Sequence, residues 1–563
     1  MAGRRTYKPG EAVGGDYSIT GTLPTLADVI AFKEGTAELD FGYYRFISPP
    51  RLRRLEEALK NSFHCRHCRL TESFEIALLE LVLCLHKPGT KSRIIILKEK
   101  DAAPPFTDNT FLPACDRDGV VVQVIERADE IPLDLGRDDA VVAVVRSRGG
   151  QLPQPPSDVS DVRFFVLGLA AGKDAVQAGA VLGNADRAMD RLAEQMRRRG
   201  PILSSRSADC LLGGTGSQGS RSDPAVSRRV AKALCRLEGG SHAFLHASGM
   251  SAITRVLDVL RRPGRSQIVA VGHLYNDTFN SLRLAPRLEN EAPNAFLGVD
   301  ELDRLDALVT DQTAAILTET ITNPLSDVPD LALLSGVARA HGIPLVVDNT
   351  IATPENCHPF DLGADYVVHS TTKYLNGRND HAGGAVIVRD AQAARLLADC
   401  QGLLNDQMSP REAEALEGNL GSLGERMCRF NENALRVASF LAEHRGVQRV
   451  FFNGLQSHRS YATARRILRG PGSVISFVLK RNSLEGLRAF YDSPLSGIIK
   501  APSLGSDLTL LCPYTLLTHY DDTDEELAEI GLPRFLVRIA VGCEKDITPV
   551  LESLQEALQR QAE

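Results

Sequence analysis

The sequence has no uninterrupted apolar run long enough to cross a membrane, and its first residues lack the apolar core of a secretory signal peptide. It has no excess of positive charge, because 71 acidic residues outnumber 64 basic ones, so a nucleic-acid-binding surface is not indicated. Its eleven cysteines are scattered rather than spaced as a disulfide framework, which is typical of reduced intracellular proteins. These absences predict a soluble cytoplasmic protein that binds neither membrane nor nucleic acid.

The stretch that says most about function is residues 343–388. Two short β-branched runs, residues 343–347 and 366–368, are bounded by turn residues, as is typical of strands buried on both faces of a parallel sheet. Polar residues follow each run: Asp348 after the first, and Ser370, Thr372 and Lys373 after the second. Because ligands of open α/β sheets bind beyond the carboxyl ends of the strands, we expect these four side chains to lie at one site.

These residue types suit pyridoxal phosphate (PLP). That cofactor needs a lysine for a Schiff base, an anion beside its ring nitrogen, and hydroxyl or amide groups for its phosphate. Lys373, Asp348 and the pair Ser370 and Thr372 match these needs in turn. The stretch also resembles the Cys/Met-metabolism PLP enzymes, whose motif reads VDNT-ATP, LGAD-VVHS-TKY-NGH-D and GG. The main departure is Arg378, which stands at the family's usual histidine.

The resemblance extends to earlier residues. Ser248, Gly249 and Met250 lead from a strand-like run into an amphipathic helix and are similar to the family's SSGM. Backbone N–H groups of Gly249 and Met250 are expected to face the cofactor phosphate, since helix N-termini bind anions and glycine permits close approach. By the same resemblance, Tyr275 stacks on the cofactor ring and helps as an acid or base. Asn323, in a segment similar to ESPTNP, is implied to hydrogen-bond the cofactor's phenolate oxygen and the substrate carboxylate.

Three positions near the C-terminus bear on substrate choice. Residues 536–544 are similar to the family's LVRLSVGIE, in which an arginine grips the substrate α-carboxylate, and Arg538 has the fork of donors for that role. Ser503, in a Ser-Leu-Gly turn, resembles the residue that orients the lysine and the substrate. Leu508 stands where γ-type members have a glutamate, which weakens the case for cysteine as co-substrate.

An internal repeat relates the first part of the chain to the second. Residues 59–89 and 234–264 align without a gap at an offset of 175 residues, and each contains a helix-like segment, a strand-like segment and a second amphipathic helix. Self-similarity of this length favours duplication. The first copy has no counterpart of the segment that carries Asp348, and Lys173, near the expected lysine position, lacks the Ser-x-Thr lead-in. The first half is therefore not expected to bind PLP.

The first half has a possible role as a partner. In the resembled family, a Tyr-x-Arg-x-x-Asn-Pro motif reaches across a dimer interface to the neighbour's cofactor phosphate. Tyr43 and Arg45 begin a similar sequence with serine in place of asparagine. We hypothesise a built-in pseudo-subunit that lends Tyr43 and Arg45 to the functional site; local packing of both is the alternative. Cys65 and Cys68 lack a second pair at zinc spacing, so no metal site is expected.

These observations predict an α/β chain with the aspartate-aminotransferase-like PLP fold (type I) and a smaller C-terminal α+β domain, preceded by a degenerate N-terminal half-copy. The expected regions are 1–200 for the degenerate copy, 201–425 for the PLP-binding large domain and 426–563 for the small domain. Because one chain would contain both halves of a family dimer, a homodimer of pseudo-dimeric chains is expected.

The resemblance implies PLP-dependent γ-elimination and γ-replacement on a γ-activated amino acid, cystathionine γ-synthase-like, with a sulfur or carbon nucleophile as second substrate. The donor is expected to be O-acylhomoserine-like or S-adenosylmethionine-like. A PLP-dependent cystathionine or methionine β- or γ-lyase is the alternative within the family. A catalytically silent PLP-fold scaffold is the alternative from another class, and the intact set of lysine, aspartate and arginine argues against it.

Overall fold

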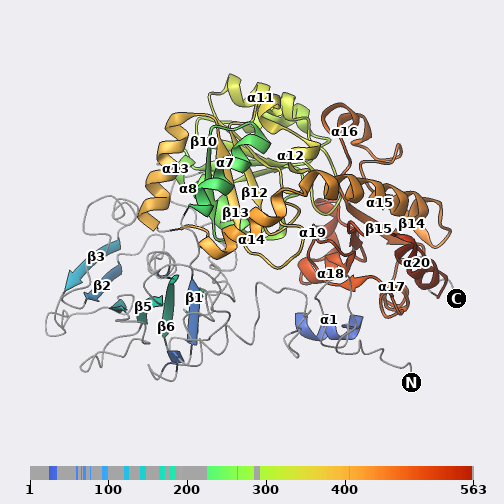
Figure 1. Ribbon diagram of the computed structural model, residues 1–563, viewed down its shortest axis with the longest axis horizontal. Helices are drawn as coiled ribbons and strands as arrows, with labels where there is room; N and C mark the ends of the chain where they lie inside the picture. Colours follow the sequence, from blue (N-terminus) through green and yellow to red (C-terminus); the bar gives the residue numbers. More distant parts are fainter. Residues whose placement is uncertain are drawn as a thin grey trace.

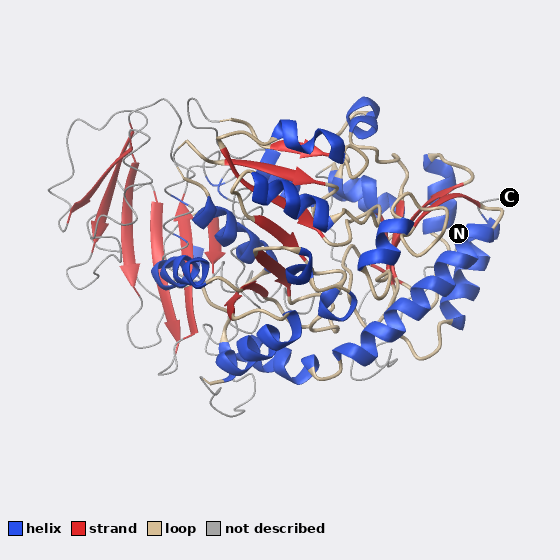
Figure 2. Cartoon of the chain, turned by 90° about the horizontal axis from the view of Figure 1, so that it is seen from above, coloured by secondary structure: helices blue, strands red, loops and turns tan. Residues whose placement is uncertain are grey.

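The computed structural model describes residues 24–34, strands and isolated residues between 59 and 192, and residues 225–560 apart from 263, 284–291 and 405. The first sheet lies at one end of the molecule, the central sheet in the middle and the C-terminal sheet at the other end (Figures 1 and 2). No helix among the described residues is long and apolar enough to cross a membrane.

The central sheet has seven strands in the order β7-β13-β12-β11-β10-β8-β9. Their bounds are β7 His242–His246, β8 Gln267–Val271, β9 Ala295–Leu297, β10 Thr313–Glu319, β11 Leu345–Asp348, β12 Tyr366–Ser370 and β13 Gly384–Val388. The five strands from β12 to β9 pair in parallel, whereas β13 runs antiparallel to β12 and β7. The two apolar runs of residues 343–388 form β11 and β12, so the predicted buried strands are in the predicted part of the chain. The result is a mixed α/β sheet.

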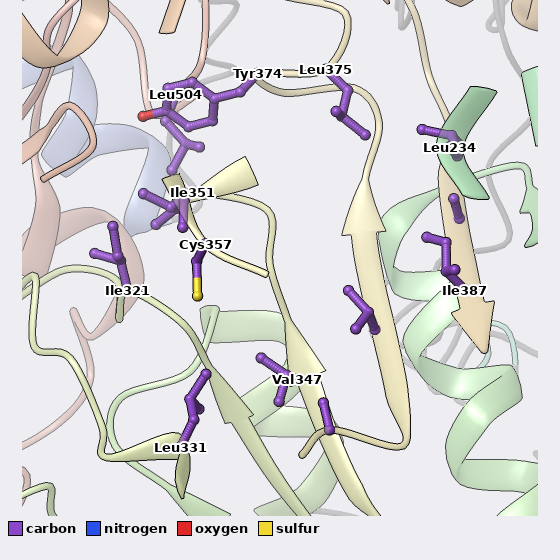
Figure 3. Close-up of a cluster of buried hydrophobic side chains, with 14 of the residues drawn as sticks. Leu234, Ile321, Leu331, Val347, Ile351, Cys357, Tyr374, Leu375, Ile387 and Leu504 are labelled. Atoms are coloured by element: carbon purple, nitrogen blue, oxygen red, sulfur yellow. The ribbon is translucent and has the colours of Figure 1, made fainter. Parts of the chain in front are cut away.

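Helices cover both faces of this sheet because successive strand residues point to opposite sides and both sides are apolar. Val346 packs with residues of α8 (Gly249–Leu260) and α13 (Ala391–Leu404). Its neighbour Val347 packs on the other side, with residues of α7 (Val226–Glu238) and α11 (Leu331–Ala340). Figure 3 shows part of this second cluster. The shorter helices are α9 Asn276–Arg283, η2 Leu302–Arg304, α10 Leu305–Leu308, α12 Thr353–Asn356, η3 Pro359–Leu362 and α14 Pro410–Leu420.

The long helix α15 (Leu423–Glu443) leads into a C-terminal α+β domain. Its five-stranded sheet has the order β14-β15-β18-β17-β16. The bounds are β14 Val447–Phe451, β15 Val474–Leu479, β16 Ile499–Lys500, β17 Leu510–Pro513 and β18 Val537–Ala540, with helices α16 Tyr461–Ile467, α17 Leu484–Tyr491, α18 Tyr514–Thr518, α19 Asp524–Glu529 and α20 Thr548–Arg560. Strands β15 and β18 lie within the apolar segments that resemble the family's C-terminal domain.

The first sheet has six strands in the order β1-β6-β5-β4-β2-β3. They are β1 His67–Thr71, β2 Ser92–Lys98, β3 Val120–Ile125, β4 Ala140–Arg146, β5 Phe164–Ala171 and β6 Val176–Gly183. The first residues of β1, β2 and β3 each lie 175 positions before those of β7, β8 and β9. The order equals that of the central sheet without β11, since β4 and β5 pair directly in parallel where β10 and β12 are separated.

Helix α1 (Leu26–Lys33) packs against the C-terminal domain, a contact that the sequence did not predict (Figure 1). Leu26 and Val29 are fully buried in a cluster with residues of α17 and α18. The backbone N–H of Leu26 donates to Asp492 Oδ1 at 2.7 Å, and Lys33 Nζ donates to the carbonyl of Leu517 at 3.2 Å. Residues at the two ends of the sequence therefore share one core.

Leu26→Ala should detach α1 from the C-terminal domain, because removing a buried leucine side chain costs roughly 2–5 kcal/mol. Hydrogen-exchange mass spectrometry should show faster exchange in α1 and in the facing helices α17 and α18. Ala27→Ser, at an exposed position of the same helix, is the matched control and should leave exchange unchanged. Equal exchange in Leu26→Ala and the parent protein would contradict the contact.

Candidate active site

The predicted polar residues meet where β10, β11 and β12 end. Glu319 and Asp348 are the last residues of β10 and β11 and lie opposite each other in the parallel register. Ser370 ends β12, the next strand in the sheet. Because the carboxyl ends of parallel strands share one edge of the sheet, their side chains project into the region where α/β folds bind ligands.

Lys373 lies just beyond β12 and reaches the C-terminal domain. Its Nζ donates to Ser503 Oγ at 3.0 Å. Burial, together with the positive charge of Arg538, lowers the pKa of Lys373 to about 8. A neutral amine, which is the nucleophilic form, is therefore available near neutral pH.

Ser503 connects this lysine to a residue that the sequence did not single out. Ser503 Oγ donates to Asn379 Oδ1 at 3.1 Å, and Asn379 is buried with a left-handed backbone, φ 54°. Asparagine tolerates this conformation better than most residues. Position 379 falls between the histidine and aspartate positions of the resembled motif, where the motif specifies nothing, so no sequence signal marked it.

Two buried carboxyl groups, Asp348 and Glu319, share the ends of β11 and β10. Burial raises the pKa of Asp348, while hydrogen bonds from Thr350 and the charge of His369 oppose the rise. Burial and the charge of Asp348 both raise the pKa of Glu319 well above its usual range. Burial therefore disfavours the charged form of both groups, and the charge of Asp348 adds to this for Glu319.

Glu319 also fixes the segment that carries Tyr275. Its Oε1 accepts from the backbone N–H of Tyr275 at 2.5 Å, and Tyr275 Oη donates to Asp277 Oδ2 at 3.0 Å. The Tyr275 side chain keeps 42% of its surface exposed. An aromatic surface that the fold leaves uncovered can stack on a planar ligand.

A buried polar cluster that the sequence analysis missed lies next to Asp348 in the fold. Glu238 Oε1 lies 2.5 Å from His369 Nε2 and accepts from Asn349 Nδ2 at 2.8 Å. His369 and Asn349 each stand next to a predicted site residue, Ser370 and Asp348. The sequence signal that could have marked His369 and Asn349 is a polar residue inside, or just after, an apolar run that is typical of a buried strand.

The start of α8 has the geometry that the predicted anion cradle needs. Ser248 is the N-cap, and its Oγ accepts from the backbone N–H of Ser251 at 3.0 Å. A Cβ at Gly249 would lie 2.6 Å from Ser370 Cβ and 2.9 Å from Ser370 Oγ, so glycine alone allows this approach. The first backbone N–H groups of a helix have no partner within the helix, so those of Gly249 and Met250 suit a phosphate.

Thr372 and Ser370 form the facing wall of the cradle. Thr372 Oγ1 accepts from the backbone N–H of Gly383 at 3.1 Å and lies 3.3 Å from the carbonyl of the same residue. The backbone N–H of Ser370 donates to Thr350 Oγ1 at 2.8 Å. These bonds fix the loop between β12 and β13, from which Lys373 also projects.

Arg538 brings the predicted substrate residues together. It lies in β18 and is 3% exposed. Its Nη1 donates to Asn323 Oδ1 at 3.1 Å, and its Nη2 donates to the carbonyls of Ser503, at 2.9 Å, and Pro502. The guanidinium also lies 5.2 Å from the ring centre of Tyr514, which the sequence analysis did not identify. The arginine is thus held from two sides beside the lysine.

Some of the predicted residues lie outside this description. Tyr43, Arg45 and Lys173 are not among the described residues. Cys65 and Cys68 are both buried, as expected for core positions. Within the described parts of the chain, no group of three or more histidine, cysteine, aspartate or glutamate side chains is arranged to hold a metal.

The donor set fits PLP. A part-buried amine with a lowered pKa, a carboxylate at a strand end and a glycine-lined helix N-terminus are the three features that this cofactor needs. The fold and site together define a PLP-dependent enzyme. The chain belongs to the family described as Cys/Met metabolism PLP-dependent enzymes, whose model matches residues 213–559.

Several named enzymes match more than half of the chain. L-Methionine gamma-lyase of Pseudomonas putida is 36% identical over 342 residues, which cover 61% of this chain and 84% of the relative. Cystathionine gamma-synthase of Mycobacterium leprae is 34% identical over 327 residues, which cover 58% of this chain and 82% of the relative. The solved structure of a cystathionine gamma synthase from Xanthomonas oryzae pv. oryzae aligns with a TM-score of 0.55 at 32% identity. The alignment covers 62% of this chain and 90% of that chain.

These comparisons confirm the predicted family, cofactor and enzyme class. The protein is a cystathionine γ-synthase-like PLP enzyme, and both transferase and lyase reactions are consistent with its relatives.

Capture of PLP by the cofactor-free protein should accelerate as pH rises and level off near pH 8, because only the neutral Lys373 amine attacks and its pKa is lowered to about 8. With a lysine of ordinary pKa, the rate of PLP capture would keep rising up to roughly pH 10.4. Stopped-flow absorbance of the lysine-bound cofactor measures the rate.

Two variants identify the lysine. Lys373→Ala should abolish both the absorbance change and borohydride-dependent labelling. Lys500→Met removes another buried lysine whose pKa is lowered to about 8, and should retain both. Unchanged labelling in Lys373→Ala would refute the assignment of this lysine.

Proposed function

We propose that the protein catalyses γ-elimination and γ-replacement on an amino acid that carries a leaving group at Cγ. The observation that supports this most directly is the double use of Ser503. Its Oγ accepts from Lys373 Nζ, and its carbonyl accepts from Arg538 Nη2. A proton-transferring amine and a carboxylate anchor are therefore set at a fixed relative position, as chemistry at the carbons of an amino acid requires.

Each residue has a defined task in this proposal. When bound, PLP supplies an electron sink for negative charge that develops on the substrate. Asp348 keeps the ring nitrogen protonated, and Tyr275 stacks on the ring. Arg538 and Asn323 bind the substrate carboxylate. Lys373, held by Ser503, removes the Cα proton and exchanges protons at Cβ, which are the steps that general acid–base catalysis must supply.

The products depend on which reaction takes place after the γ-substituent has left with the electrons of its bond to Cγ. In replacement, a sulfur or carbon nucleophile donates the electron pair of the new bond to Cγ. In the lyase alternative, hydrolysis releases a keto acid and ammonia. The likeness to L-methionine gamma-lyase and cystathionine gamma-lyase supports this second candidate, and the likeness to cystathionine gamma-synthase supports replacement equally.

The second substrate is expected to be an unusual one. Leu508 takes the place of a glutamate in γ-type members and is partly buried against the main core. Arg378, which replaces a histidine, is exposed. The nearby backbones are joined, since the N–H of Asp507 donates to the carbonyl of Gly377 at 2.8 Å. An apolar residue here cannot pair with the ammonium group of cysteine, so an O-acylhomoserine- or S-adenosylmethionine-like donor would react better with another nucleophile.

Leu508→Glu should raise the rate of cystathionine formation from an O-acylhomoserine and cysteine by about tenfold, because a hydrogen bond to a charged group contributes roughly 1.5–3 kcal/mol. Product formation is measured by mass spectrometry across a panel of donors and nucleophiles. Leu508→Gln keeps the shape without the charge and is the matched control. Efficient cystathionine synthesis by the unmodified protein would overturn the proposed nucleophile preference.

The first half is proposed to be a degenerate, cofactor-free copy that acts as a built-in partner, with regions 1–200, 201–425 and 426–563. The shared strand order supports duplication, because the first and central sheets differ only by β11 among the described strands. β11 carries Asp348, and among the described strands of the first sheet none would bring a carboxylate to that place. Tyr43 and Arg45 are proposed to contact the cofactor phosphate of the functional half.

A homodimer with one PLP per chain is the expected assembly, since two such chains match the size of a tetramer of single-unit chains. Light scattering gives the number of chains, and absorbance after alkaline release gives the PLP content. Four chains per particle, or two cofactors per chain, would contradict the built-in partner. So would unchanged PLP affinity in Arg45→Ala, with Arg51→Ala as a control outside the Tyr-x-Arg-x-x-Ser-Pro motif.

A further inference from the structure

A buried charged cluster lies behind the phosphate cradle and takes no part in the proposed chemistry. It centres on Asp406, which is fully buried between α13 and α14. Asp406 Oδ2 lies 3.0 Å from His246 Nδ1 and accepts from Arg255 Nε at 2.9 Å. Ser251 Oγ contacts both carboxylate oxygens at 2.8 Å.

The partners of Asp406 come from the elements that form the cradle. His246 ends β7, while Ser251 and Arg255 lie one turn apart on the same side of α8. Ser251 is also the residue whose backbone N–H is capped by Ser248. Asp406 therefore holds the first turn of α8 through the side chains of Ser251 and Arg255, and this is the turn whose Gly249 and Met250 N–H groups are assigned to the phosphate.

Glu412 holds the facing wall of the cradle, which Ser370 and Thr372 form. It is 3% exposed, and its Oε2 accepts from the backbone N–H of Ala382 at 3.2 Å and lies 2.9 Å from His381 Nδ1. His381 Nε2 lies 2.9 Å from Thr371 Oγ1. Thr371 stands between Ser370 and Thr372, the two hydroxyl residues assigned to the phosphate.

The segment between these two acids is itself fixed to the sheet. The backbone N–H of Met408 donates to the carbonyl of Leu245 at 3.2 Å. A Cβ at Gly383 would lie 2.4 Å from Met408 Cε and 2.7 Å from His381 Nε2, so the segment presses directly on the cradle loop. We call residues 406–412 the clasp.

A buried carboxylate is costly unless it is paired. Burial alone would raise the pKa of Asp406, yet His246, Arg255 and Ser251 together hold it below its usual range. The Asp406 carboxylate thus stays charged. The residues that pair with it lie on β7 and α8, the elements on one side of the proposed phosphate cradle.

We propose that Asp406 and Glu412 are positioning residues that hold the two walls of the phosphate cradle in their binding geometry before the cofactor arrives. This inference rests on the assignment of PLP to the site and adds the source of its selectivity for the phosphate group. Preorganised donors lose less free energy on binding than donors that must be ordered by the ligand.

The test compares PLP with pyridoxal, which reacts with the same lysine but has no phosphate. Asp406→Asn in the full-length, cofactor-free protein should weaken PLP affinity about tenfold, the lower end of the loss seen when a residue behind a metal ligand is removed. Affinity for pyridoxal should change much less, because pyridoxal has no phosphate for the cradle to bind. Binding is followed by absorbance titration. Asp406→Glu, which keeps the charge, should recover part of the PLP affinity.

Glu412→Gln provides a second variant on the opposite wall and should show the same selective loss, even if Asp406→Asn does not fold. Glu414→Gln, at an exposed position of the same helix, is the control and should bind both compounds as the parent does. Equal losses for PLP and pyridoxal, or no loss for either, would overturn the clasp. Failure of the parent protein to bind PLP at Lys373 would instead overturn the cofactor assignment, so the two failures are distinguishable.

Discussion

The hydrogen bond between Lys373 and Ser503 joins the segment after β12 of the central sheet to the segment between β16 and β17 of the C-terminal domain. Each side alone provides half of the chemistry: Asp348 and the cradle come from the central sheet, and Arg538 comes from β18. Burial and the arginine's charge both disfavour the charged form of the lysine and lower its pKa to about 8, so the neutral amine becomes the main form above that pH. The contact between the two sheets therefore sets the reactivity of the lysine as well as its position.

A second constraint acts on the paired carboxyl groups Glu319 and Asp348. Two buried carboxylates at adjacent strand ends cannot both remain charged without a large cost. Glu319 accepts from the backbone N–H of Tyr275, and burial raises the pKa of both carboxyl groups. A cationic ring nitrogen beside Asp348, as proposed for the bound cofactor, would favour the charge on that residue, while Glu319 orders the Tyr275 segment.

The sequence was informative where chemistry and local pattern coincide. Strands β11 and β12 were predictable because a β-branched run ends in a polar residue, and the start of α8 because serine and glycine mark a helix N-terminus at a strand end. Resemblance to family motifs supplied Arg538, Ser503 and Asn323, which composition alone would not have selected. The structure then brought all of them to one place.

The residues that sequence reasoning missed depend on contacts between distant parts of the chain. Asp406 looks like a polar loop residue, and Glu412 like an acidic residue in the first turn of a helix, until their buried partners on β7, α8 and the cradle loop are known. Asn379 occupies a motif position that specifies nothing. Helix α1 has a weak local signal, and its partner surface lies more than 450 residues away in the chain, between Leu26 and Asp492. No local period or propensity encodes such pairings.

Among the described strands, the first sheet has the strand order of the central sheet without β11. β10 and β12 run in the same direction on either side of β11, and β4 and β5, which hold the corresponding places in the first sheet, pair directly in parallel. The register is regular, from Val142 opposite Phe164 to Arg146 opposite Gly168. An inner parallel strand can thus be absent while the strands on either side of it still pair in one direction. The carboxylate proposed for the cofactor is carried by such a strand, so the proposed duplication needs only one described strand to differ between a cofactor-binding sheet and a cofactor-free one.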